Sequence, residues 1–448
     1  MLAAALALTG ATAGCGADSV RSAGDGPVHL TFWSALRGSK EVVDAFNRTH
    51  DRVHVDFQQV PSGLQGGYAK LGNAARAGNA PDVATLEYPQ VPGFAIDGVA
   101  RDVTPLISKD LRRKLLPQSL ALTTFAGRAY AVPLDVEPMI YLYRKDVFER
   151  HGIDVPRTWR QFAKAAAEVR RKVPGARIVN LPTDGAPLFA GFSWQAGARW
   201  FGTEGGAADG KWRVSMDDRP TRRVAAYWQR LLDRGLITSN PGDTQQGMAQ
   251  LGNGTVLGRL TGAWEAGAQI AAHPGQKGKW AVAPLPRWGS GPGRTSIGTQ
   301  GGSTFAVTRD SRHPRAAMEF IEWQVSSPEA LRARLSSGVS SQYPAVPSLV
   351  PVARKAFDES YYGGQDVYGL FRREAERISA RWRWGPRMTA THKVMQDGFA
   401  RAAGGDGTLL GAVREAQRST LPDLRALGLG VRVGPPDAAP KSRTGHGR

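Results

Sequence analysis

Residues 130–149 read YAVPLDVEPMIYLYRKDVFE, and the rest of the chain is organised around this stretch. Pro133 and Pro138 interrupt an otherwise apolar run. Because proline cannot donate a ladder hydrogen bond, two prolines this close exclude a central strand of regular pairing. The stretch is therefore predicted to be an edge strand or a segment that crosses between lobes. It would hold the carboxylates of Asp135 and Glu137 between the two prolines, with a ligand beside the crossing.

The chain is long enough for two lobes. It has 448 residues, and single cores stop growing at roughly 250 to 300 residues. An apolar content of 41% and a mean hydropathy of −0.33 are those of a folded globular protein. Beyond the extreme N-terminus, no apolar run reaches membrane-spanning length.

The formal net charge of +19 raises the question of a nucleic-acid partner. The arginines are scattered singly over the chain, however, and no basic patch coincides with an RNA-binding or helix-turn-helix signature. No nucleic acid is therefore expected. A solvated, arginine-rich surface and attraction to anionic lipid or cell-wall polymer are both left open.

The single cysteine, Cys15, follows the apolar stretch MLAAALALTGATAG. One thiol supports neither a disulfide framework nor a metal cluster. Residues 1–15 resemble a secretory signal that ends in a bacterial lipobox, although leucine usually stands at the place of Thr12 and no basic residue precedes the apolar run. A start upstream of Met1 is left open. Lipidation of Cys15 is expected, rather than an unmodified thiol, with residues 16–27 as a flexible tether.

From Val28 onwards the pattern alternates between strands and helices. VHLTFW and VHVDF place apolar residues at every second position, and Ser39 is expected to cap a helix between them. Strand, helix and strand over about thirty residues make a βαβ unit with parallel strands. Ligands bind outside the carboxyl ends of such strands, so residues 33–38 are a candidate wall of the site. The strand PDVATLEY ends by presenting Glu87 and Tyr88.

The second part of the chain also mixes helices and strands. PRTWRQFAKAAAEVRRK is the clearest helix, with Thr158 and Gln161 as a capping box. The stretch FAGFSWQAGARWFG is predicted to be too irregular for a buried helix. TVLGRLTGAWEAGAQI predicts a strand and a turn, with Trp264 at the start of a helix. WAVAPLPRW is extended, GTQGGSTFAV is a glycine-rich loop that enters a strand, and the C-terminal part is expected to be helical.

In their order along the chain, these motifs resemble a bacterial ABC-transporter extracellular solute-binding protein, family 1, of the carbohydrate-binding kind. Each motif alone is weak evidence, whereas seven in this order are strong. The resemblance extends over residues 28–429 and rests on TFWSA…EVVDAFN, NAPDVATLE, YAVPLDVEPMIYLYRKDVFERHGIDVPRTWRQF, GRLTGAWEAG, KWAVAPLP, GGSTFAVTRDSRHPRAAMEFIEWQVSSPE and WRWGP.

The resemblance implies an α/β, two-lobed fold of the type II periplasmic-binding-protein kind, with hinge crossovers and a helical C-terminus. The two lobes would close on a ligand and present it to a membrane permease. The crossings would lie at Pro133–Met139 and Val282–Pro286. The expected boundaries place lobe 1 at residues 28–133 and 284–340, lobe 2 at 134–283 and 341–430, and a disordered basic tail at 431–448.

Sugars offer many hydroxyls and apolar C–H faces, so their sites need planar polar groups and aromatic platforms. Position by position, the resemblance implies that Glu137 accepts hydrogen bonds from sugar hydroxyls and that Trp264 stacks on the ligand. A surface salt bridge of Glu137 and core burial of Trp264 are the open alternatives. Asp135 is expected to point away from the cleft. The other candidate ligand-binding residues are Arg37, Glu87, Tyr88, Trp194, Gly301, Gly302, Ser303 and Trp384.

The expected function is that of a monomeric, lipid-anchored substrate-binding protein of an ABC importer on the outer face of the cytoplasmic membrane. No cofactor, metal or catalytic residue is expected. One alternative is the same fold binding a sugar phosphate, a polyamine or a peptide. Another is a secreted glycoside hydrolase with Asp135 and Glu137 as its carboxylate pair. No HExxH, GxSxG, P-loop or metal-spaced histidine motif supports an enzyme.

Overall fold

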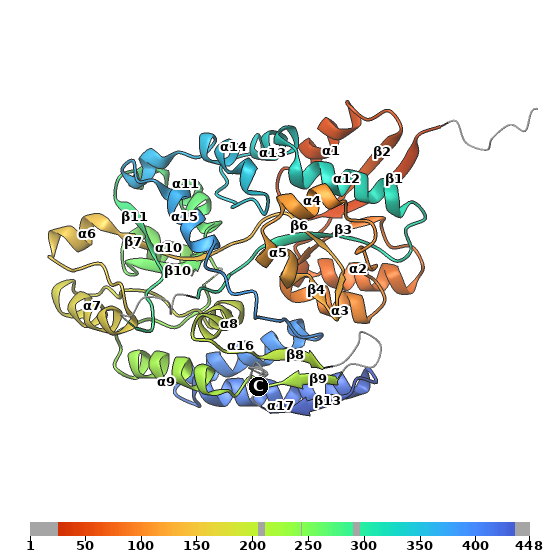
Figure 1. Ribbon diagram of the computed structural model, residues 1–448. Coiled ribbons are helices and arrows are strands. Elements are labelled where there is room, and N and C mark those ends of the chain that lie inside the picture. The colour runs from red at the N-terminus through yellow and green to blue at the C-terminus, as the bar shows by residue number, and fades with distance from the viewer. Residues whose placement is uncertain (1–25, 205–210, 243, 290–295, 435–448) are drawn as a thin grey trace, which may run out of the picture.

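Two β-sheets form the centres of two lobes, which the 130–149 stretch connects (Figure 1). The computed structural model describes residues 26–204, 211–242, 244–289 and 296–434. The predicted lipobox, Cys15 and most of the predicted tether lie outside the described residues. In the part of the chain that is described, every helix is too short or too polar to span a membrane.

The first lobe is built on a five-stranded sheet. β1 pairs in parallel with β2 and β3, and β12 pairs antiparallel with β3 and β6. The aromatic ring of Phe32 in β1 contacts Phe305 in β12 and Phe320 edge-on, so the sheet and one covering helix share a core. In spatial order the strands are β2 (Val53–Gln59), β1 (Val28–Ser34), β3 (Val83–Glu87), β12 (Ser303–Val307) and β6 (Val132–Pro133).

Helices cover both faces of this sheet (Figure 1). α1 connects β1 to β2, which confirms the predicted βαβ unit. The predicted cap is wrong: Gly38 occupies the N-cap at φ +77°, and Ser39 is the first helical residue, with its hydroxyl on Ser34. The helices of the first lobe are α1 (Ser39–Asn47), α2 (Gly67–Arg76), α3 (Val91–Ile96), α4 (Lys109–Lys114), α5 (Pro117–Leu122), α12 (Pro314–Ser326) and α13 (Pro328–Leu335).

The 130–149 stretch leaves the first sheet as its edge strand β6 and enters the second sheet as β7 (Met139–Arg144). The predicted crossing is therefore confirmed. The prediction that this stretch contains no central strand is correct only for the residues up to Pro138. β7 is the middle strand of the second sheet, between β10 (Gly258–Gly262) and β11 (Trp280–Pro284), and it is antiparallel to both. The second proline stands just before β7, where it leaves the ladder of that strand intact.

The return crossing lies later than predicted. Val282 and Pro284 pair with β7, so the expected Val282–Pro286 segment begins as a strand of the second sheet. The chain reaches the first sheet through Thr299, which forms a bridge with Pro138, and enters β12 at Ser303. The prolines of this segment end a buried strand rather than mark a crossing.

One helix of the second lobe contradicts the sequence prediction. α8 covers the first half of FAGFSWQAGARWFG, and residues 188–194 within it are buried. A helix that is apolar all round belongs in an interior, so its missing amphipathic pattern follows from its burial. The predicted capping box of α7 is confirmed. The helices of this lobe are α6 (Lys145–Arg150), α7 (Trp159–Lys172), α8 (Ala186–Gln195), α9 (Arg219–Asp233), α10 (Gln245–Asn253) and α11 (Glu265–Ala272).

The C-terminal part is helical, as predicted, and α16 and α17 lie along the second lobe beside α8 and α9 (Figure 1). Its helices are α14 (Val350–Lys355), α15 (Val367–Ala375), α16 (Met388–Gly404) and α17 (Leu409–Ala426). The predicted tail begins too early, because β13 (Val431–Val433) pairs in parallel with β9. Residues 435–448 lie outside the described residues. The remaining strands are β4 (Thr124–Phe125), β5 (Arg128–Ala129), β8 (Phe201–Glu204) and β9 (Lys211–Val214).

Candidate functional site

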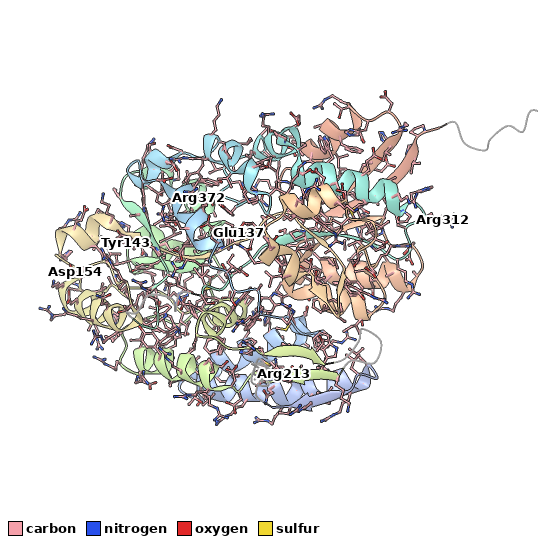
Figure 2. All side chains as sticks on the ribbon, viewed as in Figure 1. Glu137, Tyr143, Asp154, Arg213, Arg312 and Arg372 are labelled. Carbon is pink, nitrogen blue, oxygen red and sulfur yellow. The ribbon has the colours of Figure 1, made fainter. Side chains whose placement is uncertain are left out.

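A cavity of about 550 Å³ lies beside the crossing, within the size range of small-molecule sites. The loop after β1 and the end of β3 form its wall on the first lobe. The strand β10 and the start of α11 form its wall on the second lobe. Both crossings contribute to the cavity. The 130–149 stretch supplies Asp135 and Glu137, and the return crossing supplies residues 300–303. In Figure 2, Glu137 lies in the middle of the molecule, between the end that carries Asp154 and the end that carries Arg312.

The structure brings most of the candidate binding residues to this cavity. They come from five separate parts of the chain, which the two crossings hold together. Seven of the ten candidates line the cavity: Arg37, Glu87, Glu137, Trp264, Gly301, Gly302 and Ser303.

Three candidates, Tyr88, Trp194 and Trp384, lie in the protein core instead. The Tyr88 hydroxyl donates to the carbonyl oxygen of Asp135 at 2.7 Å, which holds the crossing against the first sheet. The Trp194 ring stacks on Trp382 at 5.2 Å, and Trp384 packs edge-on against the same ring. All three side chains are at most 4% exposed. These three side chains therefore contribute to packing and not to the cavity lining.

Glu137 presents a carboxyl group without a partner. Its side chain is 1% exposed, and neither carboxyl oxygen has a hydrogen-bond partner among the described residues. Burial, and then the charge of Asp135, raise the pKa of Glu137 well above its usual value. The backbone N–H groups of Trp264 and Tyr343 lie near enough to the carboxyl to oppose this shift in part, although neither meets the geometry of a hydrogen bond. A buried polar group of this kind costs free energy until a donor reaches it. The alternative of a surface salt bridge finds no partner among the described residues.

Asp135 also lines the cavity, although it was expected to point away. Its carboxylate is already engaged: it accepts hydrogen bonds from the Ser303 backbone N–H at 2.7 Å and from the Gln342 side chain. Burial raises the pKa of Asp135 to about 6, and these two hydrogen bonds and the charge of Arg334 oppose the shift. Asp135 therefore links the crossing to β12, whereas the carboxyl oxygens of Glu137 stay available for a ligand.

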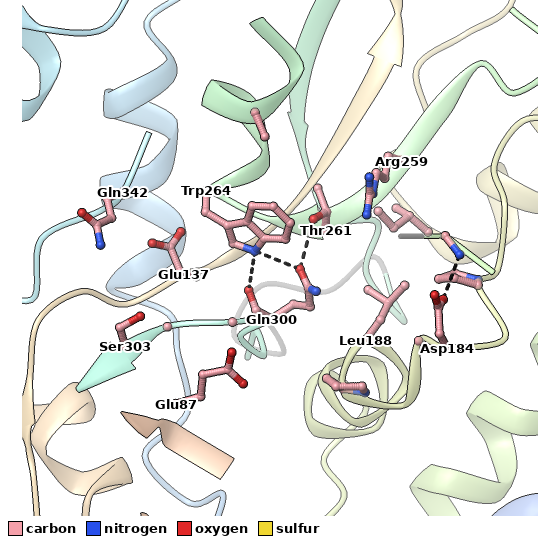
Figure 3. A pocket seen from close by; sticks show the side chains of 18 of the residues that line it. Glu87, Glu137, Asp184, Leu188, Arg259, Thr261, Trp264, Gln300, Ser303 and Gln342 are labelled. Carbon is pink, nitrogen blue, oxygen red and sulfur yellow. Dashed lines mark hydrogen bonds between the residues drawn. The ribbon is translucent and has the colours of Figure 1, made fainter. Parts of the chain in front are cut away.

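Trp264 stands at the N-cap of α11 with its ring on the cavity wall (Figure 3). Its indole Nε1 donates to the backbone and side-chain oxygens of Gln300, each at 3.2 Å. The same Gln300 side-chain oxygen accepts from the Thr261 hydroxyl at 3.0 Å and from the Gly262 N–H at 2.8 Å. Gln300 thus fixes the half-buried indole from the crossing.

A glycine makes this close approach possible. Gly301 has φ +87°, and a Cβ there would stand 3.0 Å from the indole Nε1 of Trp264. Gln300 itself was missed by the sequence analysis. The only signal was its place in GTQGGS, where it is the one long polar side chain in a glycine-rich loop.

Further polar residues line the far end of the cavity and were also missed. His392 reaches it from α16, and burial lowers the pKa of this imidazole to about 4, so it is neutral at pH 7. Gln396, one turn further along α16, donates to the Asp184 carbonyl oxygen at 2.6 Å. Arg259 on β10 donates to Glu265 at 3.0 Å. Residues this far apart in the chain carry no shared sequence signal.

Among the described residues, no group of three or more His, Cys, Asp or Glu side chains is arranged to bind a metal ion. The chemistry that the cavity offers is hydrogen bonding and ring stacking. Carboxyl and amide groups line the cavity together with one indole ring, and that combination suits a polyhydroxylated ligand with apolar faces.

Comparison with known proteins agrees with this arrangement. The family described as bacterial extracellular solute-binding protein matches residues 34–330. The arabinooligosaccharide-binding protein of Bacillus subtilis is 27% identical over 336 residues, which are 72% of this chain and 74% of that protein. The lactose-binding protein of Rhizobium radiobacter is 26% identical over 204 residues, which are 45% of this chain and 46% of that protein.

The fold has close counterparts among solved structures. The galacto-N-biose-/lacto-N-biose I-binding protein of an ABC transporter from Bifidobacterium longum, solved with lacto-N-biose, superposes with a TM-score of 0.78 at 25% identity. The match covers 91% of this chain and 99% of that one. The two-lobed α/β fold predicted from the sequence motifs is thereby confirmed. Since the family match covers more than half of the 448 residues, the chain belongs to the bacterial extracellular solute-binding proteins.

Proposed function

We propose that the chain captures a sugar or an oligosaccharide between its two lobes and delivers it to the membrane permease of an ABC importer. One observation carries the proposal: a fully buried carboxyl without a partner, Glu137, lies beside a half-buried indole, Trp264, in a cavity between two lobes. The first group suits hydroxyl donors and the second suits the C–H face of a sugar ring. The relatives named for arabinooligosaccharides and lactose support the same substrate class.

Capture would be coupled to closure of the lobes. Glu87 and Ser303 belong to the first lobe and Trp264 to the second, so a ligand in the cavity contacts both. Such a ligand favours the closed form only through its greater affinity for that form. The permease would then recognise the closed pair of lobes.

We further propose a monomer without enzymatic activity, held at the outer face of the membrane through a lipidated Cys15. A glycoside hydrolase needs two carboxyl groups that act on the bond to be cleaved. In this cavity the oxygens of Asp135 are bound by Ser303 and Gln342, which leaves only Glu137 of that pair uncommitted. The non-sugar alternatives remain tests of the proposal rather than parts of it.

A thermal-shift screen of the full chain tests the substrate class. The panel contains arabinobiose, lactose, lacto-N-biose and maltose, with spermidine, glucose 6-phosphate and trialanine as non-sugar probes. A ligand at a hundred times its Kd adds about 2.7 kcal/mol of stability, which raises Tm by several degrees. We expect shifts for neutral saccharides. A shift with spermidine, the phosphate or the peptide alone would contradict the proposal.

Gln300→Leu is expected to weaken sugar binding by about tenfold, because Trp264 loses the side-chain acceptor that helps to orient its ring and keeps only the backbone one. Gln300→Glu keeps that acceptor and should restore most of the affinity. The decisive measurement is a double-mutant cycle by calorimetry. If Gln300 acts through Trp264, its replacement costs nothing in a Trp264→Ala background. An unchanged tenfold loss in that background would show that Gln300 acts by another route.

Sugar affinity is expected to rise from pH 5 towards pH 8. Burial raises the pKa of Asp135 to about 6 and that of Glu137 well above its usual value, with Glu87 and Arg334 as charged neighbours in the cavity. Hydroxyl donors stabilise the ionised carboxyl, so binding lowers its pKa and releases a proton. One released proton changes Kd by at most about tenfold per pH unit below the free protein's pKa.

Calorimetry in two buffers with different ionisation enthalpies measures this proton release directly. In Glu137→Gln the release should fall and the pH profile should flatten. A wild-type Kd that stays constant over this pH range, with no proton released, would show that these carboxyls do not bind the ligand.

A further inference from the structure

The part of the cavity beside the crossing is rich in carboxyl groups, although the molecule as a whole is basic. The chain as a whole carries +19, yet the carboxyl groups of Glu87, Asp135 and Glu137 meet beside the crossing. They lie close enough for the charge of Asp135 to raise the pKa values of both Glu87 and Glu137. A ligand that enters at this point meets an acidic surface inside a basic protein.

Two of the arginines that line the cavity are held by other groups, and a third, Arg37, is exposed and donates to the Val339 carbonyl oxygen at 3.4 Å. The Arg334 guanidinium, on a residue only 4% exposed, donates to Gln324 at 3.3 Å and to the Arg37 carbonyl oxygen at 3.5 Å. Arg259 forms an ion pair with Glu265 at 3.0 Å. His392 is neutral at pH 7. Among the described residues, none of these cations forms an ion pair with Glu137.

Glu137 is the group that distinguishes between ligands. A neutral hydroxyl satisfies one of its lone pairs but leaves a charge buried, which is costly. An ammonium group supplies the hydrogen bond and the opposite charge together, and such charge-assisted bonds are about twice as strong as neutral ones. Figure 3 shows the Glu137 carboxyl beside the Trp264 ring. The face of an indole also attracts a cation, so both neighbours favour positive charge.

We propose that the cavity selects saccharides that carry a protonated amine, with the ammonium group bound by Glu137 next to the indole of Trp264. The inference rests on the proposed function, because it names a class of sugar for the same site. It also assigns the opposite preference to sugar phosphates and uronic acids, because anions bound beside Trp264 would meet the carboxyl groups of Glu87, Asp135 and Glu137.

Calorimetry on the full chain with two matched series tests this inference. One series is cellobiose, the β-1,4 disaccharide of glucosamine, its N,N′-diacetyl form and cellobiouronic acid. The other is galactose, galactosamine, N-acetylgalactosamine and galacturonic acid. Within a series the members differ chiefly in the charge that they carry. We expect the amine to bind about tenfold tighter than its neutral counterpart in at least one series, and the acid to bind weakest.

The outcomes separate the two proposals. If neutral sugars bind and the amines bind no tighter, the charge preference is overturned and sugar binding stands. If an acid binds tighter than its neutral counterpart, the sign of the preference is wrong. If neither series binds, nor any neutral saccharide of the thermal-shift panel, both proposals fall. Binding of spermidine without any saccharide would overturn both proposals as well.

The variant Glu137→Gln tests whether the preference for amines comes from the Glu137 carboxyl group. Glu137→Gln keeps the shape of the side chain and removes its charge, and the free protein is expected to fold, as its Tm will show. The preference for the amine should disappear, so that the amine and its neutral counterpart bind this variant with affinities within about threefold of each other. Glu149→Gln on the exposed face of α6 is the matched control and should leave the preference intact. A tenfold preference that survives Glu137→Gln would contradict the assignment.

Discussion

Trp264→Ala is expected to weaken sugar binding by about a hundredfold, or ~3 kcal/mol, and to leave the stability of the free protein almost unchanged. The indole is half-buried on the cavity wall, so its contacts are made mainly with the ligand. Aromatic anchors of this kind dominate binding energies because they bury a large rigid surface at little cost in conformational entropy.

Two further variants control this experiment. Trp264→Phe keeps a platform but loses the Nε1 donor to Gln300, and it should recover affinity to within about tenfold of the wild type. Trp33→Ala removes another half-buried tryptophan, which lies under Lys70 outside the cavity, and should leave affinity unchanged. An unchanged Kd in Trp264→Ala, measured by calorimetry, would remove this residue from the site.

Trp194→Ala should have the opposite effect, a loss of about 3–5 kcal/mol in the free energy of unfolding with little change in affinity. Its side chain is 2% exposed and stacks on Trp382, with the rings 7° from parallel. Its Nε1 donates to the Ser379 carbonyl oxygen at 3.1 Å, so the large-to-small change leaves a cavity and an unpaired acceptor. Urea denaturation measures the stability.

The folded fraction of Trp194→Ala is expected to bind sugar within about threefold of the wild type, because the indole lies away from the cavity lining. A large loss of affinity at unchanged stability would place Trp194 in the site after all. Trp264 and Trp194 were both candidate platforms in the sequence, and their burial separates the two expected outcomes.

The parts of the fold that could be predicted rest on local patterns. Alternating apolar residues indicated β1 and β2, the Thr158 and Gln161 pair marked the start of α7, and two prolines marked the crossing. α8 could not be predicted in this way, because a helix buried on all sides has no amphipathic period to detect. The position of the return crossing was predicted wrongly for a related reason. In the sequence, prolines that end a strand cannot be distinguished from prolines in a segment that crosses between two sheets.

The site was predictable only where one residue has a recognisable setting. Glu137 lies between prolines in the crossing and Trp264 follows a glycine turn, and both reach the cavity. Gln300 contacts Trp264 and Gln342 contacts Asp135, which lie tens or hundreds of positions away in the sequence, and no local pattern indicates such contacts. Whether an aromatic residue faces a cavity or the core depends on the packing of the whole lobe.

The most direct test of sugar capture at Glu137 and Trp264 is a crystal structure of the full chain with a saccharide that gives a thermal shift. We expect a sugar ring stacked on the Trp264 indole, with a ligand donor within 3.2 Å of a Glu137 carboxyl oxygen, since hydrogen bonds span about 2.7–3.2 Å. We also expect contacts from both lobes. A saccharide bound elsewhere, or in the cavity without either contact, would show that these two residues do not capture the sugar.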